Sequence, residues 1–361
     1  MDDAARPSAG LIPSDDLTLH QTAETFQRTD TLHPKWTERW YFNLQDGDGR
    51  LLGICGGGFY PFSGVLDVYA CLLSAGRQHN LRQRVRAVDR GRLDAAEQVR
   101  FTIVDAMRTW HASATCPAFA LELRFQAGNV AHLFPPFVVA ADLPDSSSAL
   151  EFDAIQHFVQ PGQVSGELRV GSARPKPFDA QSFRDRTWGV RSARPRLHNW
   201  FVFHADEGQY VTLIHQERAN GTPMVSHMAV VAADGSARTL VLDEHDLTFH
   251  PRTRLLLAAR YRGHDAAGRR VELTVENIGD GVRLLGAGYT SAQGDASAED
   301  GVASETWDLG DADLMTRMGR GTIDSPARMV LHFGDGVTLH GVGVTESAIA
   351  RNHWRYGSQI M

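Results

Sequence analysis

The chain has 361 residues, of which 42% are hydrophobic and 22% are charged. This composition excludes a mainly disordered protein, because it supplies enough apolar surface to offset the entropy that a chain loses on folding. The net charge of −7 argues against nucleic acid as a partner, since phosphate binding needs clustered cations.

Residues 1–30 are polar and irregular, and we expect them to form an N-terminal arm that lies on the fold. Short apolar runs typical of β-strands follow from Trp36 onward. A turn signal, Asp46-Gly47-Asp48-Gly49, separates the first two runs. In the first half of the chain these runs are Arg39–Gln45, Leu51–Gly57, Val65–Leu73, Gln98–Val104, Phe119–Gln126 and Val164–Val170.

The second half has the same pattern, with Asp-Gly dipeptides and related turn signals at the joints. Short runs spaced in this way predict antiparallel barrels or sandwiches. The expected strands are Asn199–Ala205, Gln209–Gln216, Val225–Ala232, Arg238–Leu242, Leu255–Tyr261, Arg270–Glu276, Val282–Gly286, Arg328–Phe333 and Val337–Thr345. The polar tract Ser291–Asp300 is expected to be an exposed loop.

One junction divides the chain almost in half. Proline removes a donor from a sheet ladder, so Arg174-Pro175-Lys176-Pro177 should not continue a sheet interior. We therefore expect two all-β domains, the first spanning residues 31–177 and the second residues 178–361.

Several other classes of protein do not fit. No apolar run approaches a membrane span, and the first ten residues lack the apolar core of a secretory signal. The three cysteines form no Cys-x-x-Cys pair, so we expect buried thiols and a cytoplasmic location. No Gly-x-Gly-x-x-Gly leads from a strand into a helix, which disfavours a dinucleotide-binding domain.

The segment Phe183–Arg191 gathers three arginines around Asp185 and Trp188. If the arginines pair with Asp185, the pKa of this carboxyl falls. If they point outward and Asp185 faces an apolar pocket, desolvation raises its pKa and the group becomes a proton donor. A salt-bridge cluster that pins the two domains together is the structural alternative.

The next candidate site is the segment His198–His204. On a strand, His198, Trp200 and His204 share one face, which suits a pocket wall, whereas Phe201 and Phe203 share the other, which suits a core. A hairpin after this strand could bring His215 to the same pocket.

We expect no metal, although the chain has 16 histidines. No His-Glu-x-x-His motif occurs, and His198 and His204 would lie about 20 Å apart on a strand. A site assembled from distant strands remains as an alternative.

Near the C-terminus, Gly341 and Gly343 lie on one face of an expected strand and Glu346 on the other. A strand face without side chains allows close approach of a ligand or another backbone. A barrel strand curved by its glycines is the structural alternative.

These segments resemble the AttH-like and carotenoid 1,2-hydratase-like group, whose members consist of two lipocalin-type barrels. Three motifs of that group are W-x-D-[RH]-E-W-G, W-[DN]-W-F and G-x-G-x-x-E. The matching positions are Asp185, Arg186, Trp188 and Gly189, then Asn199, Trp200 and Phe201, then Gly341, Gly343 and Glu346. Phe183 and Thr187 replace the tryptophan and glutamate of the first motif, so this chain must use another acid where relatives use that glutamate.

The resemblance implies two lipocalin-like antiparallel β-barrel domains packed together, and acid–base chemistry without a cofactor. We expect a hydratase, dehydratase, isomerase or cyclase that acts on a hydrophobic terpenoid or aromatic small molecule. Proton transfer is assigned first to Asp185 and His215 and then to His198 and Glu346. The residues expected to bind substrate are Trp188, Trp200, His204 and Arg186.

Three alternatives stay open at the level of the sequence. A non-catalytic carrier or sensor of a lipophilic ligand would need no titrating residue inside its pocket. A metal-dependent hydrolase would hold a metal that elemental analysis can detect. A homodimer is compatible with everything that the sequence shows.

Overall fold

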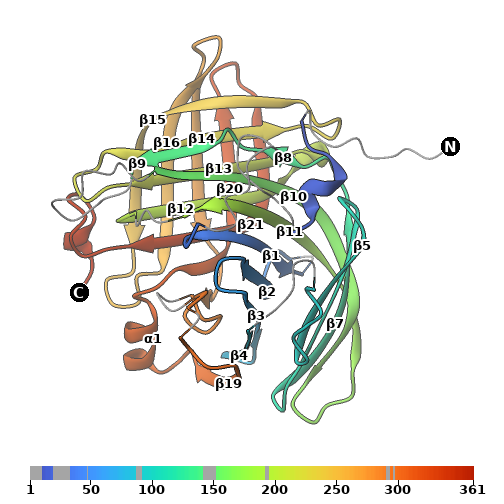
Figure 1. Ribbon diagram of the computed structural model, residues 1–361. Coiled ribbons are helices and arrows are strands. Elements are labelled where there is room, and N and C mark those ends of the chain that lie inside the picture. Colours follow the sequence, from blue (N-terminus) through green and yellow to red (C-terminus); the bar gives the residue numbers. More distant parts are fainter. Residues whose placement is uncertain are drawn as a thin grey trace.

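The computed structural model describes residues 10–18, 33–46, 48–86, 92–140, 152–191, 195–289, 293–295 and 297–361. Strands make up 61% of the structure and helices 6%, which confirms the expected all-β class. The strands form two large antiparallel sheets, one blue to green and the other mostly yellow to red in Figure 1. In the part of the chain that is described, no helix is long and apolar enough to cross a membrane.

The first sheet is curled and is built mainly by the first half of the chain. Its strands are β1 (Trp36–Gln45), β2 (Leu51–Tyr60), β3 (Val65–Ser74), β4 (Arg77–Val85), β5 (Val99–Asp105), β6 (Thr109–Thr115), β7 (Phe119–Ala127), β8 (His132–Leu133), β9 (Phe137–Ala140), β10 (Phe152–Val170), β11 (Lys176–Val190) and β19 (Gly301–Asp308). The path through them is open, running from β19 through β4, β3, β2, β1, β11, β10, β7 and β6 to β5.

The second sheet has nine strands, of which all but β18 close into an eight-stranded barrel. Its strands are β12 (Leu197–Ala205), β13 (Tyr210–Glu217), β14 (Pro223–Val231), β15 (Ala237–Phe249), β16 (Leu256–Asp265), β17 (Arg270–Asn277), β18 (Val282–Arg283), β20 (Ile323–Phe333) and β21 (Thr338–Ile349). Strand β12 pairs with both β13 and β21, and pairing of β17 with β20 completes the ring. The two expected barrels are therefore one closed barrel and one curled sheet.

The helices are short. They are η1 (Pro13–Asp16), η2 (Asp206–Gly208), α1 (Ala312–Met318) and η3 (Gly357–Gln359). The side chain of Asp311 caps α1 by accepting hydrogen bonds from the backbone N–H groups of Asp313 and Leu314. The described part of the expected N-terminal arm contains η1, and the rest of residues 1–30 lies outside the described residues.

Alternation along each strand distributes the apolar side chains over three large cores and one small one. On β12, Phe201 and Phe203 point into the barrel, whereas Trp200 and Val202 point toward the first sheet, as expected from the period of two. A third core fills the concave side of the curled sheet and contains Trp40, Phe42, Phe101, Trp110 and Phe125. The core between the sheets holds them together and frames the cavity between them.

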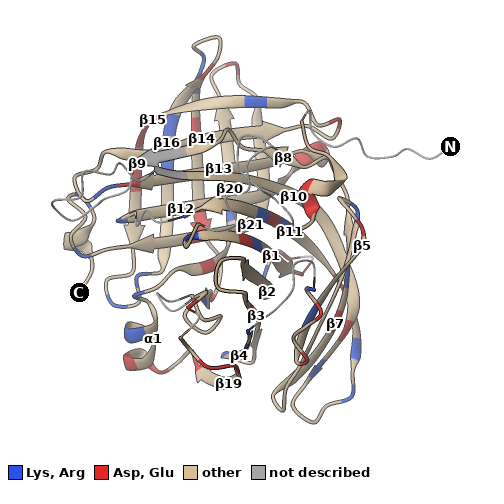
Figure 2. Cartoon of the chain, viewed as in Figure 1, with Lys and Arg blue, Asp and Glu red and all other residues tan. Residues whose placement is uncertain are grey.

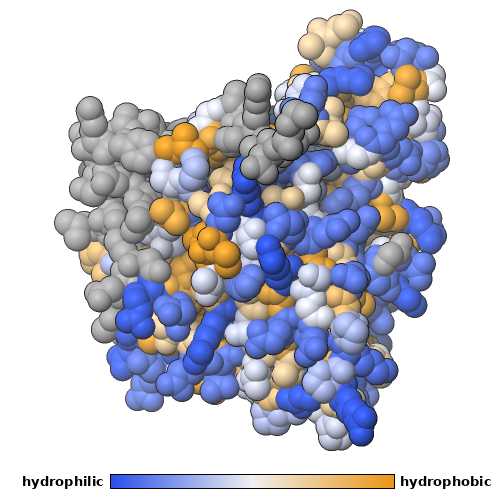
Figure 3. Space-filling model, turned by 90° about the vertical axis from the view of Figure 1, so that its right-hand side faces the viewer, coloured by the Kyte–Doolittle hydropathy of each residue, from blue (hydrophilic) through white to orange (hydrophobic). Residues whose placement is uncertain are grey.

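The outer strands of the curled sheet alternate buried and exposed residues, most clearly on β7. The view of this side of the molecule shows a mainly hydrophilic surface with scattered hydrophobic residues (Figure 3). Such alternation is typical of antiparallel sheets that bury one face and expose the other to water.

Most of the expected strands exist, and the hairpin that joins β12 to β13 has the expected turn. The expected junction at Arg174–Pro177 is a hairpin inside the first sheet, where Pro177 is the second residue of β11 and pairs with Glu167. Sheet membership changes later, between Val190 and Leu197. The division of the chain into domains at residues 177 and 178 stays a prediction.

Cys55, Cys71 and Cys116 are buried free thiols, as expected. Burial raises the pKa of Cys55 to about 12, so its thiol stays protonated and unreactive near neutral pH.

Gly343 lies where β21 passes too close to β12 for any side chain to fit. A Cβ at Gly343 would lie 1.9 Å from the carbonyl oxygen of Val202, a backbone atom that cannot move away cheaply. The glycine therefore serves the close approach of strand β12. We expect Gly343→Ala to lower the free energy of unfolding by about 1–3 kcal/mol, the usual cost of overpacking, in urea titrations.

Gly301 in β19 is the matched control for this prediction, because a Cβ there meets nothing within 4 Å. Gly301→Ala should leave the urea midpoint almost unchanged. Equal midpoints for the two variants would contradict the packing argument.

Candidate active site

A cavity of about 90 Å³, partly open to solvent, lies between the curled sheet and the barrel. Its walls come from β1, β10 and β11 on one side and from β12, β13 and β21 on the other. The residues around it include Arg39, Tyr41, His157, Asp185, Thr187, Arg191, His198, Trp200, Gln216, Tyr289 and Glu346. Four expected site residues thus meet there: Asp185, His198, Trp200 and Glu346.

Alternation along β11 decides which of its residues reach this cavity. Asp185 and Thr187 line the cavity, whereas Arg184, Arg186 and Trp188 lie on the opposite face. Figure 2 shows basic and acidic segments close together on β1 and β11 in the middle of the molecule. Arg184 and Arg186, which flank Asp185 in the sequence, therefore point away from the cavity, and of the three arginines in this segment Arg191 alone lines it.

Arg186 and Trp188 were expected to bind substrate, and the structure places both away from the cavity. Arg186 is fully buried and pairs with Glu38, with 3.3 Å between Nη2 and Oε2. It also donates to the carbonyl oxygens of Arg39 and Leu17. Trp188 packs in a small core with Trp36 and Phe158. Their role in this geometry is structural.

Asp185 has the electrostatics of a proton donor. Burial raises the pKa of Asp185 to about 7, and the carboxylate of Glu346 adds to the rise, whereas Arg39 and Arg191 act against it. Of the two expectations for this residue, the structure supports the raised pKa. A carboxyl that titrates near neutral pH can both give and take a proton under physiological conditions.

Glu346 is the ionised partner in the cavity. Burial alone would raise the pKa of Glu346, but the hydrogen bond from His198 and the positive charges of Arg191 and Arg39 outweigh burial and lower the pKa. His198 Nε2 lies 2.7 Å from Glu346 Oε1, and the amide of Gln216 donates to His198 Nδ1 at 2.9 Å. Because Nδ1 accepts, Nε2 carries the proton and donates it to the carboxylate.

Asp324, a residue that the sequence did not single out, lies behind Glu346. The two residues face each other across the β20–β21 ladder. Burial and the neighbouring Glu346 raise the pKa of Asp324 well above its usual range, so Asp324 holds a proton while Glu346 is charged. Tyr41, which lines the cavity, donates to Asp324 Oδ2 at 2.6 Å. A chain of polar contacts thus runs from the cavity into the protein.

The cavity also carries cationic groups. The guanidinium of Arg39 lies 4.3 Å from the centre of the Tyr289 ring, a cation–π contact. Tyr289 Oη lies 3.1 Å from Tyr69 Oη, which fixes the ring. Arg191 is exposed and lines the same cavity. The cavity is therefore more polar than the apolar pocket that the resemblance implied.

His157 and Trp200 form a neutral wall. The indole N–H of Trp200 donates to His157 Nε2 at 3.0 Å, so His157 Nδ1 carries the proton that reaches Thr187 Oγ1 at 2.9 Å. Burial lowers the pKa of His157 to about 3, which keeps the imidazole neutral. Thr187, which replaces the glutamate of the expected motif, thus helps to fix the orientation of the wall.

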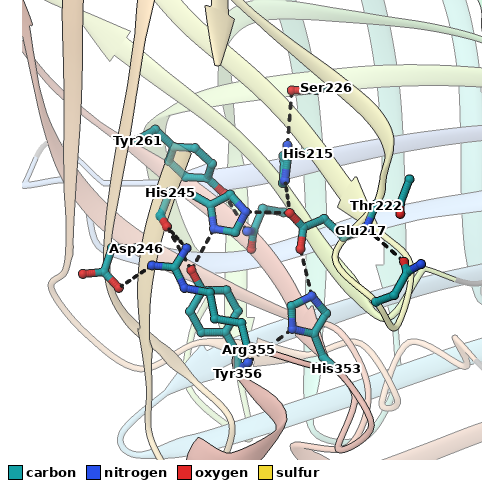
Figure 4. A network of polar contacts seen from close by, with 12 residues as sticks. His215, Glu217, Thr222, Ser226, His245, Asp246, Tyr261, His353, Arg355 and Tyr356 are labelled. Carbon is teal, nitrogen blue, oxygen red and sulfur yellow. Dashed lines mark hydrogen bonds and ion pairs between the residues drawn. The ribbon is translucent and has the colours of Figure 1, made fainter. Parts of the chain in front are cut away.

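His204 and His215 were expected at the cavity, and neither lines it. His204 packs on Phe183, with 4.1 Å between the ring centres, in the core between the sheets. His215 is on the face of β13 that points into the barrel, together with Val211 and Leu213. There it joins a separate cluster around Glu217, shown in Figure 4.

A comparison with models of protein families shows which family the chain belongs to. The family described as Domain of unknown function (DUF7064) matches residues 21–302, which is more than half of the chain. The chain belongs to the DUF7064 family. No curated protein matches it.

Two solved structures share the fold of this DUF7064 member. A candidate AttH from Nitrosomonas europaea is 13% identical, with a TM-score of 0.53, over 92% of this chain and 98% of that chain. Kievitone hydratase from Nectria haematococca is 9% identical, with a TM-score of 0.50, over 96% of each chain. The resemblance to the AttH-like proteins is thereby confirmed for the fold.

Proposed function

We propose that this protein is a lyase or isomerase that uses acid–base chemistry, and that its substrate binds between the two sheets. The observation that carries the proposal is the pair Asp185 and Glu346, one titrating near neutral pH and the other ionised, in one cavity. Pairs of carboxyl groups whose environments separate their pKa values are typical of acid–base sites. A carrier of lipophilic ligands has no need for such a pair.

The chemistry follows from the positions of the groups. Asp185, when protonated, donates its proton to an alkene carbon or to a departing hydroxyl group. The aromatic faces of Trp200 and Tyr289 stabilise the cation that forms. Glu346, held by His198, then accepts a proton either from water that adds to the cation or from the substrate itself. Protonation of an alkene followed by addition of water is hydration, and protonation of an alkene followed by loss of a substrate proton is isomerisation or cyclisation. Departure of the hydroxyl as water followed by loss of a substrate proton is dehydration.

The walls favour a substrate with an apolar body and an anionic or phenolic end. Trp200, Ile214 and Val225 supply apolar contacts, whereas Arg39 and Arg191 supply positive charge. A terpenoid or aromatic molecule with a carboxylate or phenol fits this division. One structural relative, kievitone hydratase, is named for a reaction of the same class.

The proposal is tested in D2O with the purified full chain and a panel of isoprenoid and phenolic alkenes and alcohols. Mass spectrometry follows the gain or loss of water and the uptake of deuterium at carbon. We expect wild type and the exposed-site control Asp179→Asn to catalyse uptake from the same compound, and Glu346→Gln to lose it. Tight binding of panel compounds without uptake or turnover would instead support the carrier alternative and overturn the proposal.

The pH dependence gives an independent prediction. Because Asp185 has to be protonated before it can act as the acid, kcat should fall as the pH rises through about 7. Initial rates at saturating substrate between pH 5 and pH 9 measure this fall in kcat. A rate that stays constant across this range would remove Asp185 from the role of the acid.

A further inference from the structure

A cluster of three histidines around one carboxylate lies inside the barrel, apart from the cavity. His215 Nε2 lies 3.0 Å from Glu217 Oε1, and His245 Nε2 lies 2.7 Å from the same oxygen. His353 Nε2 lies 2.8 Å from the other oxygen, Glu217 Oε2. Figure 4 shows the three imidazoles converging on the carboxylate from different segments of the chain.

We propose that His215, His245 and Glu217 bind one divalent transition-metal ion, for which zinc is the best fit. Two imidazoles and a carboxylate are a ligand set that proteins use for zinc and iron(II). The three ligand atoms lie within 4.8 Å of one another. Around zinc, with bonds of about 2.0–2.1 Å, such atoms lie roughly 3.4 Å apart, so small movements suffice.

The hydrogen bonds that His353 makes around the proposed ligands also fit a metal site. His353 Nδ1 accepts the backbone N–H of Tyr356 at 3.3 Å, so His353 Nε2 carries a proton and donates it to Glu217 Oε2. This contact orients the carboxylate and leaves Glu217 Oε1 directed at His215 and His245. His353 is therefore a positioning residue.

The two ligand histidines have hydroxyl partners on their other nitrogen. His245 Nδ1 lies 2.8 Å from Tyr356 Oη, which itself donates to the carbonyl oxygen of His245. His215 Nδ1 lies 3.2 Å from Ser226 Oγ. Each hydroxyl oxygen can accept an Nδ1–H, which leaves the Nε2 lone pair for the metal. Metal binding then releases any proton that the Nε2 atoms carry.

Burial agrees with this geometry. The side chains of His215 and Glu217 are only 5% and 6% exposed, so water does not surround the proposed ligand atoms.

The site is distinct from the proposed active site. His215 and Glu217 point into the barrel, whereas their neighbours Ile214 and Gln216 on β13 line the cavity. His353 and Tyr356 come from the C-terminal segment that follows β21. A metal here would therefore fasten this segment to β13 and β15, and its presence does not depend on the reaction proposed for the cavity.

The test uses the full chain, stripped with a chelator and then titrated with Co²⁺ alone. We expect one Co²⁺ per chain, with visible absorption bands of a four- or five-coordinate ion that Zn²⁺ abolishes by displacement. His245→Asn should weaken Co²⁺ binding more than 100-fold, and His353→Gln should weaken it about 10–100-fold, the usual effect of losing an outer contact. The exposed His332→Asn is the matched control and should bind as wild type does.

Folding is checked by circular dichroism before each titration. If His245→Asn does not fold, the milder His353→Gln and a rise in the wild-type Tm on adding Zn²⁺ decide the matter, because a ligand that binds the native state raises Tm. Absence of saturable one-to-one binding by folded wild type would overturn the proposal. So would equal binding by all three variants, since the metal would then lie at other residues.

Discussion

Replacing Asp185 by asparagine should lower kcat at least 100-fold while the fold survives. Asparagine keeps the size of the side chain but cannot donate a carboxyl proton, and loss of a general acid or base usually costs this much. The effect should be on kcat more than on KM, because Asp185 acts on the reacting atoms. Steady-state kinetics on the substrate found in D2O measures it, with Asp179→Asn as the control on the same strand.

The same variant should be more stable than wild type at high pH, although it is less active. The folded pKa of Asp185, about 7, is above its usual value, so the protonated form is favoured in the folded state. Ionisation therefore costs stability as the pH rises from about 4 to 7, by roughly 1.4 kcal/mol per unit at most. Asp185→Asn should match wild type near pH 4 and exceed it by about 2–4 kcal/mol at pH 8. Full turnover by Asp185→Asn, or lower stability at pH 8, would show that Asp185 is a structural residue.

The largest loss of stability is expected for Asp16→Asn. Asp16 and Arg184 form an ion pair in which the side chains are 0% and 1% exposed, with 2.5 Å between Oδ1 and Nη1. Asp16 also accepts from the N–H of Met107 and the indole of Trp110. Removing its charge leaves the guanidinium of Arg184 buried without a counter-charge, which typically costs about 3–5 kcal/mol. Urea unfolding at pH 7 measures the loss.

Asp48→Asn is the control for this prediction, because the exposed ion pair of Asp48 with Arg50 should contribute about 1 kcal/mol or less. The pH dependence adds a second check. Burial alone would raise the pKa of Asp16, but Arg184 outweighs it and lowers the pKa. The ion pair therefore stabilises wild type above about pH 4 and is lost only as the pH falls through the lowered pKa, where the two proteins should converge. A small difference at pH 7 would mean that the folded state tolerates an uncompensated Arg184.

The fold could be predicted from the sequence because its strands follow simple alternation. On β12, Trp200 and Phe201 lie on opposite faces, as the period of two predicts. The strand β4, in contrast, contains three arginines and no apolar run, and its pairing with β3 decides its conformation. Strand β19 was not expected either, because its sequence also lacks an apolar run; the predicted loop ended just before it, at Asp300.

The candidate site was harder to predict because neighbours in the sequence point to opposite sides of a strand. Arg186 and Trp188 were grouped with Asp185 although the period of two separates them. The same rule applied to β1 would have placed Arg39 and Tyr41 together on one face. Asp324 could not have been found in this way, because its place opposite Glu346 depends on the register between β20 and β21.

Strand β19 gives the molecule a property that neither sheet has by itself. It comes from the second half of the chain, after the first six strands of the barrel and before β20 and β21, yet it pairs along its whole length with β4 of the first sheet. The segment between β18 and β20 thus adds a strand to the first sheet before the chain returns to the barrel. Because β19 ties a segment of the barrel's half of the chain to the first sheet, we expect the two sheets to fold and unfold in one cooperative transition.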